Sequence, residues 1–146
     1  MEKKEKLLRL AADLDNDLET QDVQKLLPYF SEECEIEIFG HSLKGREGVE
    51  KWLKWFFGIF KTIKFEPIII MVEENIFFEE FYITVSFENG ETIRVKVAEV
   101  LTYENDKIRS LRLYLDRLEF VEASLKGFFS KSIVKMIKKK SVEGLF

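Results

Sequence analysis

The chain has 146 residues, of which 46% are apolar, and its 14 phenylalanines predict an aromatic core large enough to enclose a small cavity within one domain. One cysteine and one histidine argue against a disulfide or a zinc site built from this chain, and no apolar run approaches the ~18 residues of a membrane span, so we expect a cytoplasmic protein. The net charge is −4, but Lys126–Lys140 holds six lysines and no acid, which leaves −10 for the rest and disfavours nucleic-acid binding.

Three helices are predicted in the first 60 residues. Apolar residues recur at helical spacing over Glu2–Leu18, a short second helix begins after a cap at Asp22, and a third with a wide aromatic face spans Arg46–Phe60. A strand, Cys34–Phe39, and a loop, Gly40–Gly45, separate the second and third helices.

The second half of the chain predicts four strands joined by tight turns. Asn89-Gly90 and Asn105-Asp106 are hairpin signals. The predicted strands are Ile63–Val72, Asn75–Glu88, Thr92–Tyr103 and Lys107–Asp116. Helices first and long strands last predict an α+β fold, a cone-shaped curled antiparallel sheet packed on the N-terminal helices.

The last hairpin carries polar residues in an apolar row. If Asn105 and Asp106 are its two turn residues, Glu99 lies opposite Arg112, and both share the buried face. The same register places Val97 opposite Tyr114 and Val95 opposite Asp116.

Two interpretations of this row remain open. An apolar face with a few converging polar groups is typical of a ligand pocket, and Glu99, Arg112 and Asp116 would be its polar content. Alternatively, Glu99 and Arg112 form an ion pair that only sets the register, while Asp116 caps the segment that follows.

Three segments, PYFSEECEIEI, GREGVEKWLKWFF and ENDKIRSLRLYLDRLEFVEA, resemble the nuclear transport factor two-like superfamily. Within it they are similar to SnoaL-like polyketide cyclases and limonene epoxide hydrolases, over roughly Ala11 to Ala123. The resemblance implies a SnoaL-like cone domain over residues 1–120, with 121–146 as a helical extension of that domain. It also implies a homodimer, and it predicts the fold better than the reaction.

The resemblance can be followed at each catalytic position of the epoxide hydrolases. Asp116 falls on the final aspartate of that set, and Phe81 and Ile83 fall on its Arg-x-Asp pair. Ile36 and Ile38 fall on its Tyr-x-Asn pair. With one of five positions retained, ordinary epoxide hydrolysis is not expected. The base of the ketosteroid-isomerase-like proteins also lands near Ile38.

The C-terminal segment has helically spaced apolar residues with a bend near Gly127. This helix could cover the outer face of the last strands, where Leu111, Leu113 and Leu115 are expected, or extend a homodimer interface. A basic amphipathic helix can also lie on an anionic membrane, which is the least favoured of the three.

The sequence therefore predicts a protein that binds a small hydrophobic molecule. If it is an enzyme, it is expected to isomerise, cyclise or hydrate this molecule without a cofactor or metal. The predicted catalytic residues are Asp116, Glu99 and Arg112. The predicted ligand-binding residues are Ile36, Ile38, Phe81, Ile83, Val97, Tyr114 and Leu118. The alternative is a non-catalytic domain for dimerisation or protein binding. The many charged residues, 34%, are typical of a thermophile.

Overall fold

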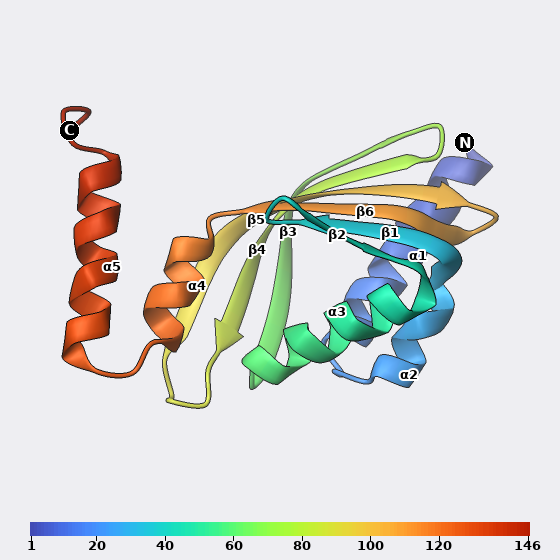
Figure 1. Ribbon diagram of the computed structural model, residues 1–146. Coiled ribbons are helices and arrows are strands. Elements are labelled where there is room, and N and C mark those ends of the chain that lie inside the picture. Colours follow the sequence, from blue (N-terminus) through green and yellow to red (C-terminus); the bar gives the residue numbers. More distant parts are fainter.

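The computed structural model describes residues 1–146 and shows an α+β fold around one curled sheet (Figure 1). The sheet has six strands in the order β2-β1-β6-β5-β4-β3. The elements are α1 (Glu2–Leu18), α2 (Val23–Leu26), a 3-10 turn η1 (Leu27–Tyr29), β1 (Phe30–Ile38), β2 (His41–Lys44), α3 (Gly45–Ile59), β3 (Thr62–Glu73), β4 (Ile76–Ser86), β5 (Thr92–Glu104), β6 (Lys107–Leu115), α4 (Arg117–Ser124) and α5 (Phe128–Ser141). The predicted fold class is confirmed.

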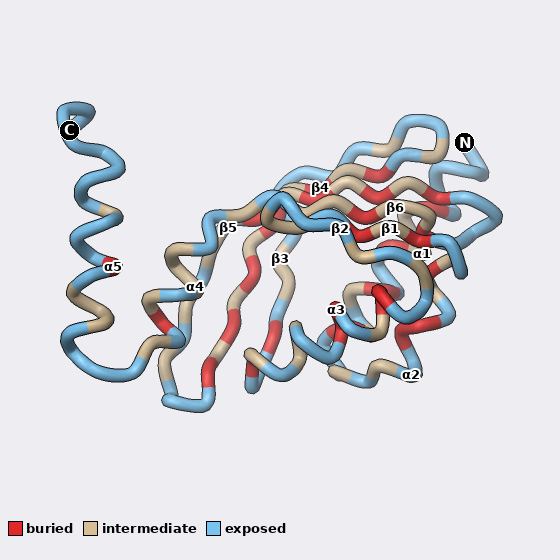
Figure 2. Tube along the Cα trace, viewed as in Figure 1, coloured by how far each residue is buried: buried red, intermediate tan, exposed pale blue.

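The helices α1, α2 and α3 cover one face of the sheet, and α4 follows β6 (Figure 1). Buried positions alternate with partly exposed ones along β4 and much of β5, and they recur at helical spacing on α1 and α3 (Figure 2). Asp22 caps α2 as predicted, because its side chain accepts hydrogen bonds from the backbone N–H groups of Gln24 and Lys25. No helix is both long and apolar enough to span a membrane.

Two features at the start of the sheet differ from the sequence-based expectation. The predicted loop Gly40–Gly45 contains β2, a short exposed strand whose residues do not alternate in polarity. The turn into it uses positive φ angles at Phe39 and Gly40. β1 pairs with β6 in the parallel direction, so the sheet is not antiparallel throughout.

The β4–β5 hairpin has a three-residue loop, Glu88–Gly90. The backbone N–H of Phe87 donates a 2.9 Å hydrogen bond to the carbonyl oxygen of Glu91, and Gly90 has a φ of 86°. This loop length sets the register in which Glu79 lies directly opposite Glu99. A two-residue loop would move each partner by one position and separate the two carboxylates onto opposite faces.

The β5–β6 hairpin begins as predicted and then changes register. Asn105 and Asp106 form a two-residue turn with positive φ, and Tyr103 pairs with Ile108. Arg109 is then an extra residue in β6, a β-bulge, so that Thr102 pairs with Ser110. From this point on, the predicted register is wrong by one residue.

The bulge exchanges the two faces of β6. Glu99 lies opposite Leu113 and not Arg112, and Val97 lies opposite Leu115 and not Tyr114. The predicted pairing of Val95 with Asp116 is also absent, because β6 ends at Leu115.

The three leucines of β6 therefore face the helices instead of the outer side. Leu111 is buried in the core, and Leu113 and Leu115 line a cavity. The C-terminal helix does not cover them. α5 stands apart from the sheet and packs against α4, where Lys138 forms ion pairs with Glu119 and Glu122 (Figure 1).

Candidate functional site

A cavity of about 280 Å³ lies between the helix-covered face of the sheet and helices α3 and α4. Of its 19 lining residues, 16 are hydrophobic, and they come from α1, α3, α4 and five strands. The aromatic members are Phe39, Trp52, Trp55, Phe56, Phe60, Phe65, Phe81 and Phe120. Such a lining removes apolar ligand surface from water and offers few polar groups that could bind a hydrated ion.

Only three polar residues line this cavity: Glu99, Arg117 and Ser124. Arg117 is exposed at the start of α4, and its guanidinium carbon lies 5.4 Å from the centre of the Phe39 ring. Its charge is therefore at the solvent side. Glu99 is only 8% exposed, so the carboxylate is the buried polar end of the cavity.

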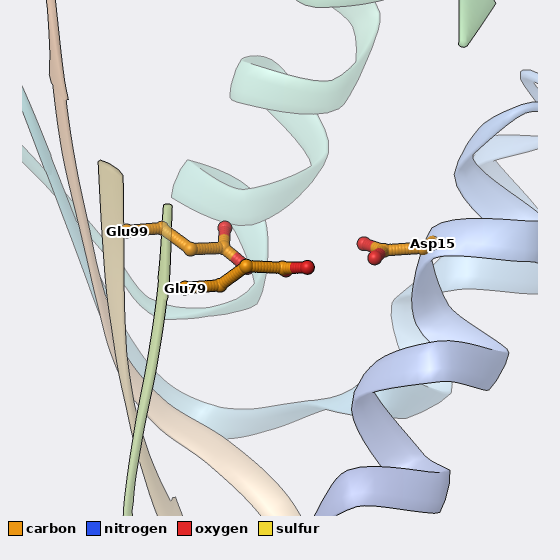
Figure 3. Close-up of side chains that lie close together, drawn as sticks. All are labelled: Asp15, Glu79 and Glu99. Carbon is orange, nitrogen blue, oxygen red and sulfur yellow. The ribbon is translucent and has the colours of Figure 1, made fainter. Parts of the chain in front are cut away.

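Glu99 belongs to a cluster of three carboxylates, which we call the acid cluster: Asp15, Glu79 and Glu99. One carboxylate oxygen from each lies within 4.8 Å of the others (Figure 3). Glu79 and Glu99 are opposite each other on β4 and β5, and Asp15 reaches toward them from α1. Asp15 points inward because Ala11 and Leu18, four residues before it and three after it, belong to the buried face of α1.

The acid cluster has no positive partner, since none of its carboxylates takes part in an ion pair with lysine, arginine or histidine. Burial raises the pKa of Glu79 to about 7. Burial, followed by the charges of Glu79 and Glu19, raises the pKa of Asp15 to about 8. Burial, followed by the charges of Asp15 and Glu79, raises the pKa of Glu99 well above its ordinary value.

These pKa values mean that the acid cluster holds protons at neutral pH. A protonated carboxyl beside an ionised one supplies both a proton donor and a proton acceptor at one place. Glu99 is the member that also lines the cavity. The arrangement can therefore exchange a proton with a bound molecule at Glu99 and restore the proton from Glu79 or Asp15.

Two of the three buried side-chain polar atoms without a hydrogen-bond partner belong to this region; the third is the hydroxyl of Ser31. The hydroxyl of Tyr103 is one of the two, and the charges of Glu99 and Asp15 add to burial in raising its pKa. The other is the indole Nε1–H of Trp52, a residue that lines the cavity. Both groups are free to bond to a ligand or to water in this region.

The structure brings together some of the predicted site residues and separates the others. Glu99, Ile38, Phe81, Ile83 and Val97 line the cavity as expected from their positions. The remaining predicted site residues are Ile36, Arg112, Tyr114, Asp116 and Leu118, and none of them lines it.

The bulge at Arg109 explains most of this difference. It turns Arg112 and Tyr114 to the outer face, where Tyr114 is 52% exposed and Arg112 lies beside Glu37 of β1. Asp116 is the N-cap of α4, and its side chain accepts a 2.9 Å hydrogen bond from the backbone N–H of Leu118. The capping alternative describes Asp116 correctly, whereas the Glu99–Arg112 ion pair is absent.

Ile36 and Leu118 lie outside the cavity for separate reasons. Ile36 is fully buried in the core formed with α1 and α3. Leu118 is partly buried in the first turn of α4.

Sequence reasoning missed the role of Asp15 and Glu79. Glu79 was visible as an interruption of the apolar row Phe77, Phe81, Ile83, but its pairing with Glu99 depends on the three-residue loop between the strands. Asp15 gave a weaker signal, a carboxylate beside an otherwise apolar helix stripe. Nothing in the local sequence indicates that this stripe faces the two glutamates.

Comparisons with known proteins agree with this architecture. The family model for the SnoaL-like domain matches residues 12–111. No curated protein matches the sequence.

Solved structures resemble the fold at low sequence identity. An NTF2-like protein of unknown function from Burkholderia pseudomallei is 12% identical, with a TM-score of 0.75 over 83% of this chain and 98% of that one. A putative SnoaL-like polyketide cyclase from Jannaschia sp. is 11% identical, with a TM-score of 0.73 over 82% and 91%. SalBIII, an epoxide hydrolase/cyclase-like enzyme of pyran ring formation in the polyether salinomycin, is 16% identical, with a TM-score of 0.71 over 80% and 95%.

Proposed function

This chain belongs to the SnoaL-like domain family, and on that premise we propose that it binds a small hydrophobic molecule in the cavity and exchanges a proton with it at Glu99. The single observation that carries the proposal is an apolar cavity whose buried end is a carboxylate with raised pKa. Isomerisation, cyclisation and hydration are the reactions that such a site can support without a cofactor.

The size and lining of the cavity favour a small ligand. Its volume of about 280 Å³ is just below the ~300–1,000 Å³ typical of ligand pockets. Sixteen hydrophobic lining residues supply the affinity, and one buried acid supplies the orientation. SalBIII acts in ring formation, which makes cyclisation one of the reactions to test on this chain.

The chemistry begins with the proton on Glu99. Transfer of this proton to a basic atom of the ligand breaks the O–H bond of the carboxyl group and leaves a buried carboxylate. Glu79, with a pKa of about 7, can return a proton to Glu99, and Asp15 can do the same from α1. The positive charge that develops on the ligand is stabilised by the carboxylate left behind.

The test compares Glu99→Gln with Glu80→Gln. Glu80 is on the same strand as Glu79 but pairs with Ala98 on the opposite face, so it controls for the loss of a glutamate. We expect a panel of small apolar epoxides, enones and cyclic ethers to raise the Tm of the wild type and of Glu80→Gln. Glu99→Gln should still bind these compounds but should not convert them, as followed by gas chromatography. Absence of binding by the wild type would overturn the proposal.

A second candidate function is dimerisation or protein binding without catalysis. The observation in its favour is the exposed apolar stretch Ile68–Met71 on the edge strand β3, in which Met71 is 57% exposed. Apolar edge strands commonly pair with another chain. Light scattering after gel filtration would test it, with Ile70→Lys expected to convert a homodimer into a monomer.

A further inference from the structure

The buried end of the cavity has more carboxyl groups than a neutral ligand can use. Glu99 lines the cavity, is 8% exposed and has no hydrogen-bond partner or ion pair. Glu79, 2% exposed, lies beside it on β4, and Asp15 points toward both glutamates from α1 (Figure 3). Buried carboxylates are normally paired with a cation, and this cluster has none from the chain itself.

We propose that the ligand is a hydrophobic amine, whose nitrogen binds at Glu99 as an ammonium group and whose hydrocarbon part lies between the aromatic walls of the cavity. This inference rests on the proposed function, because it names the class of molecule that receives the proton. It makes Glu99 the direct partner of the nitrogen, with the carboxyl groups of Glu79 and Asp15 as its neighbours.

The charge of an amine fits the acid cluster. Glu99 lines the cavity and can accept an N–H from an ammonium group, and one carboxyl oxygen of Glu79 and one of Asp15 lie within 4.8 Å of the Glu99 oxygen. Charge-assisted hydrogen bonds of this kind are stronger than bonds to neutral groups. A neutral oxygen on the ligand would bring no charge to this group of acids.

The aromatic lining fits the same ligand. The faces of Trp52, Phe56 and Phe81 attract the positive charge and the methylene groups next to it, which carry part of that charge. Arg117 does not compete at this end, because it is exposed and stacks over Phe39. A hydrated divalent cation is a poorer fit, because its remaining water ligands would meet a mostly apolar lining.

The proton balance of binding follows from Glu99 and the titratable groups around it. Glu99 is the member that lines the cavity, and its neighbours are Asp15 of α1, Glu79 of β4 and Tyr103 of β5, with Glu19 close to Asp15. A free amine takes the proton of Glu99, so that an N–H bond forms as the O–H bond breaks. An amine that arrives already protonated displaces that proton, which leaves to solvent.

The experiment is calorimetric titration of the full chain with phenethylamine and with phenethyl alcohol, at pH 7.5, in phosphate and in Tris. The two probes have nearly the same shape, and only the amine carries charge. We expect the amine to bind about tenfold or more tighter than the alcohol. Its apparent enthalpy should differ between the buffers because protons are released, whereas that of the alcohol should not.

Variants separate this inference from the proposed function. Glu99→Gln should lose the tenfold preference for the amine and bind the alcohol as before, while Glu80→Gln should behave as the wild type. Circular dichroism should show that both variants are folded. If the alcohol binds at least as tightly as the amine, the amine inference is wrong and the apolar cavity of the proposed function stands. If neither probe binds, both are wrong.

Discussion

The two hairpins that share β5 differ in how their strands pair, although each begins with a recognisable turn. In the β4–β5 hairpin, a three-residue loop keeps Glu79 and Glu99 opposite each other on the buried face. In the β5–β6 hairpin, one extra residue after the turn moves three leucines to that face and Arg112 and Tyr114 away from it. In each hairpin, a difference of one residue therefore decides which side chains reach the buried face, since side chains alternate along a strand.

The largest expected effect comes from inserting one alanine between Arg109 and Ser110. The bulge takes up one extra residue, so the later residues of β6 would move by one position, and Arg112 would replace Leu113 opposite Glu99 while Ser110 replaced Leu111. Burying an arginine and exposing two core leucines should cost more than about 4 kcal/mol, enough to prevent folding. Urea denaturation followed by circular dichroism would measure this.

Arg109→Ala is the matched control for the insertion. It keeps the residue count and removes only the contacts of Arg109 with Glu33, so the loss of stability should stay within about 1 kcal/mol. A folded insertion variant with wild-type stability would contradict the role of the bulge.

The next prediction uses pH to test the β4–β5 hairpin. The pKa of Glu79 rises from an ordinary 4.5 to about 7 on folding, so the unfolded chain loses this proton first. The raised pKa of Glu79 therefore contributes about 3 kcal/mol to the free energy of unfolding. This contribution is fully present below pH ~4.5 and is lost as the pH rises to about 7.

Glu79→Gln keeps the shape of the protonated side chain and removes its titration. We expect this variant to be more stable than the wild type at pH 8 by about 2–3 kcal/mol and to differ little at pH 4. Urea denaturation at both pH values measures the difference, and Glu80→Gln serves as the control. Parallel stability curves for wild type and Glu79→Gln would contradict the raised pKa.

A smaller effect compares two neighbouring residues of β6. Leu113 lines the cavity opposite Glu99, whereas Tyr114 faces outward. Leu113→Ala should cost about 2 kcal/mol and change the affinity for an apolar probe. Tyr114→Ala should cost about 0.5 kcal/mol and leave the affinity unchanged. Equal effects on affinity would show that the assigned faces of β6 are wrong.

The smallest effect concerns Asp116, where β6 ends. Its side chain caps α4 and does not line the cavity, so Asp116→Ala should cost about 1 kcal/mol and leave ligand affinity unchanged. Asp116→Asn should retain the stability, because asparagine is an equally good N-cap. Loss of ligand binding in Asp116→Asn would show that Asp116 belongs to the ligand site.

Much of the fold could be predicted from local patterns. The helical spacing of leucines predicted α1 over its observed range, and Asp22 marked the start of α2. The alternation in β3 to β6 and the two Asn-containing turns predicted the strands, because these signals act over a few residues. The short strand β2 and the parallel pairing of β1 with β6 were not predicted, since neither depends on a local pattern.

The site was predicted less well than the fold. Glu99 and four of the apolar residues could be placed from alternation alone. Arg112, Tyr114 and Asp116 were misplaced because a bulge leaves no reliable mark in the sequence. Asp15 was missed because it comes from a helix far from the strands in the chain.

By itself, the sequence determined the element types, the α+β class and the burial of one acid on β5, because these depend on the spacing of apolar residues along one segment. Only the tertiary structure decided which faces meet. The bulge at Arg109, the loop before β5 and the approach of α1 to the sheet together place three carboxylates at the end of an aromatic cavity. The physical reason is that a pKa depends on burial and on neighbouring charges in space, and these are brought together by packing between segments far apart in the chain.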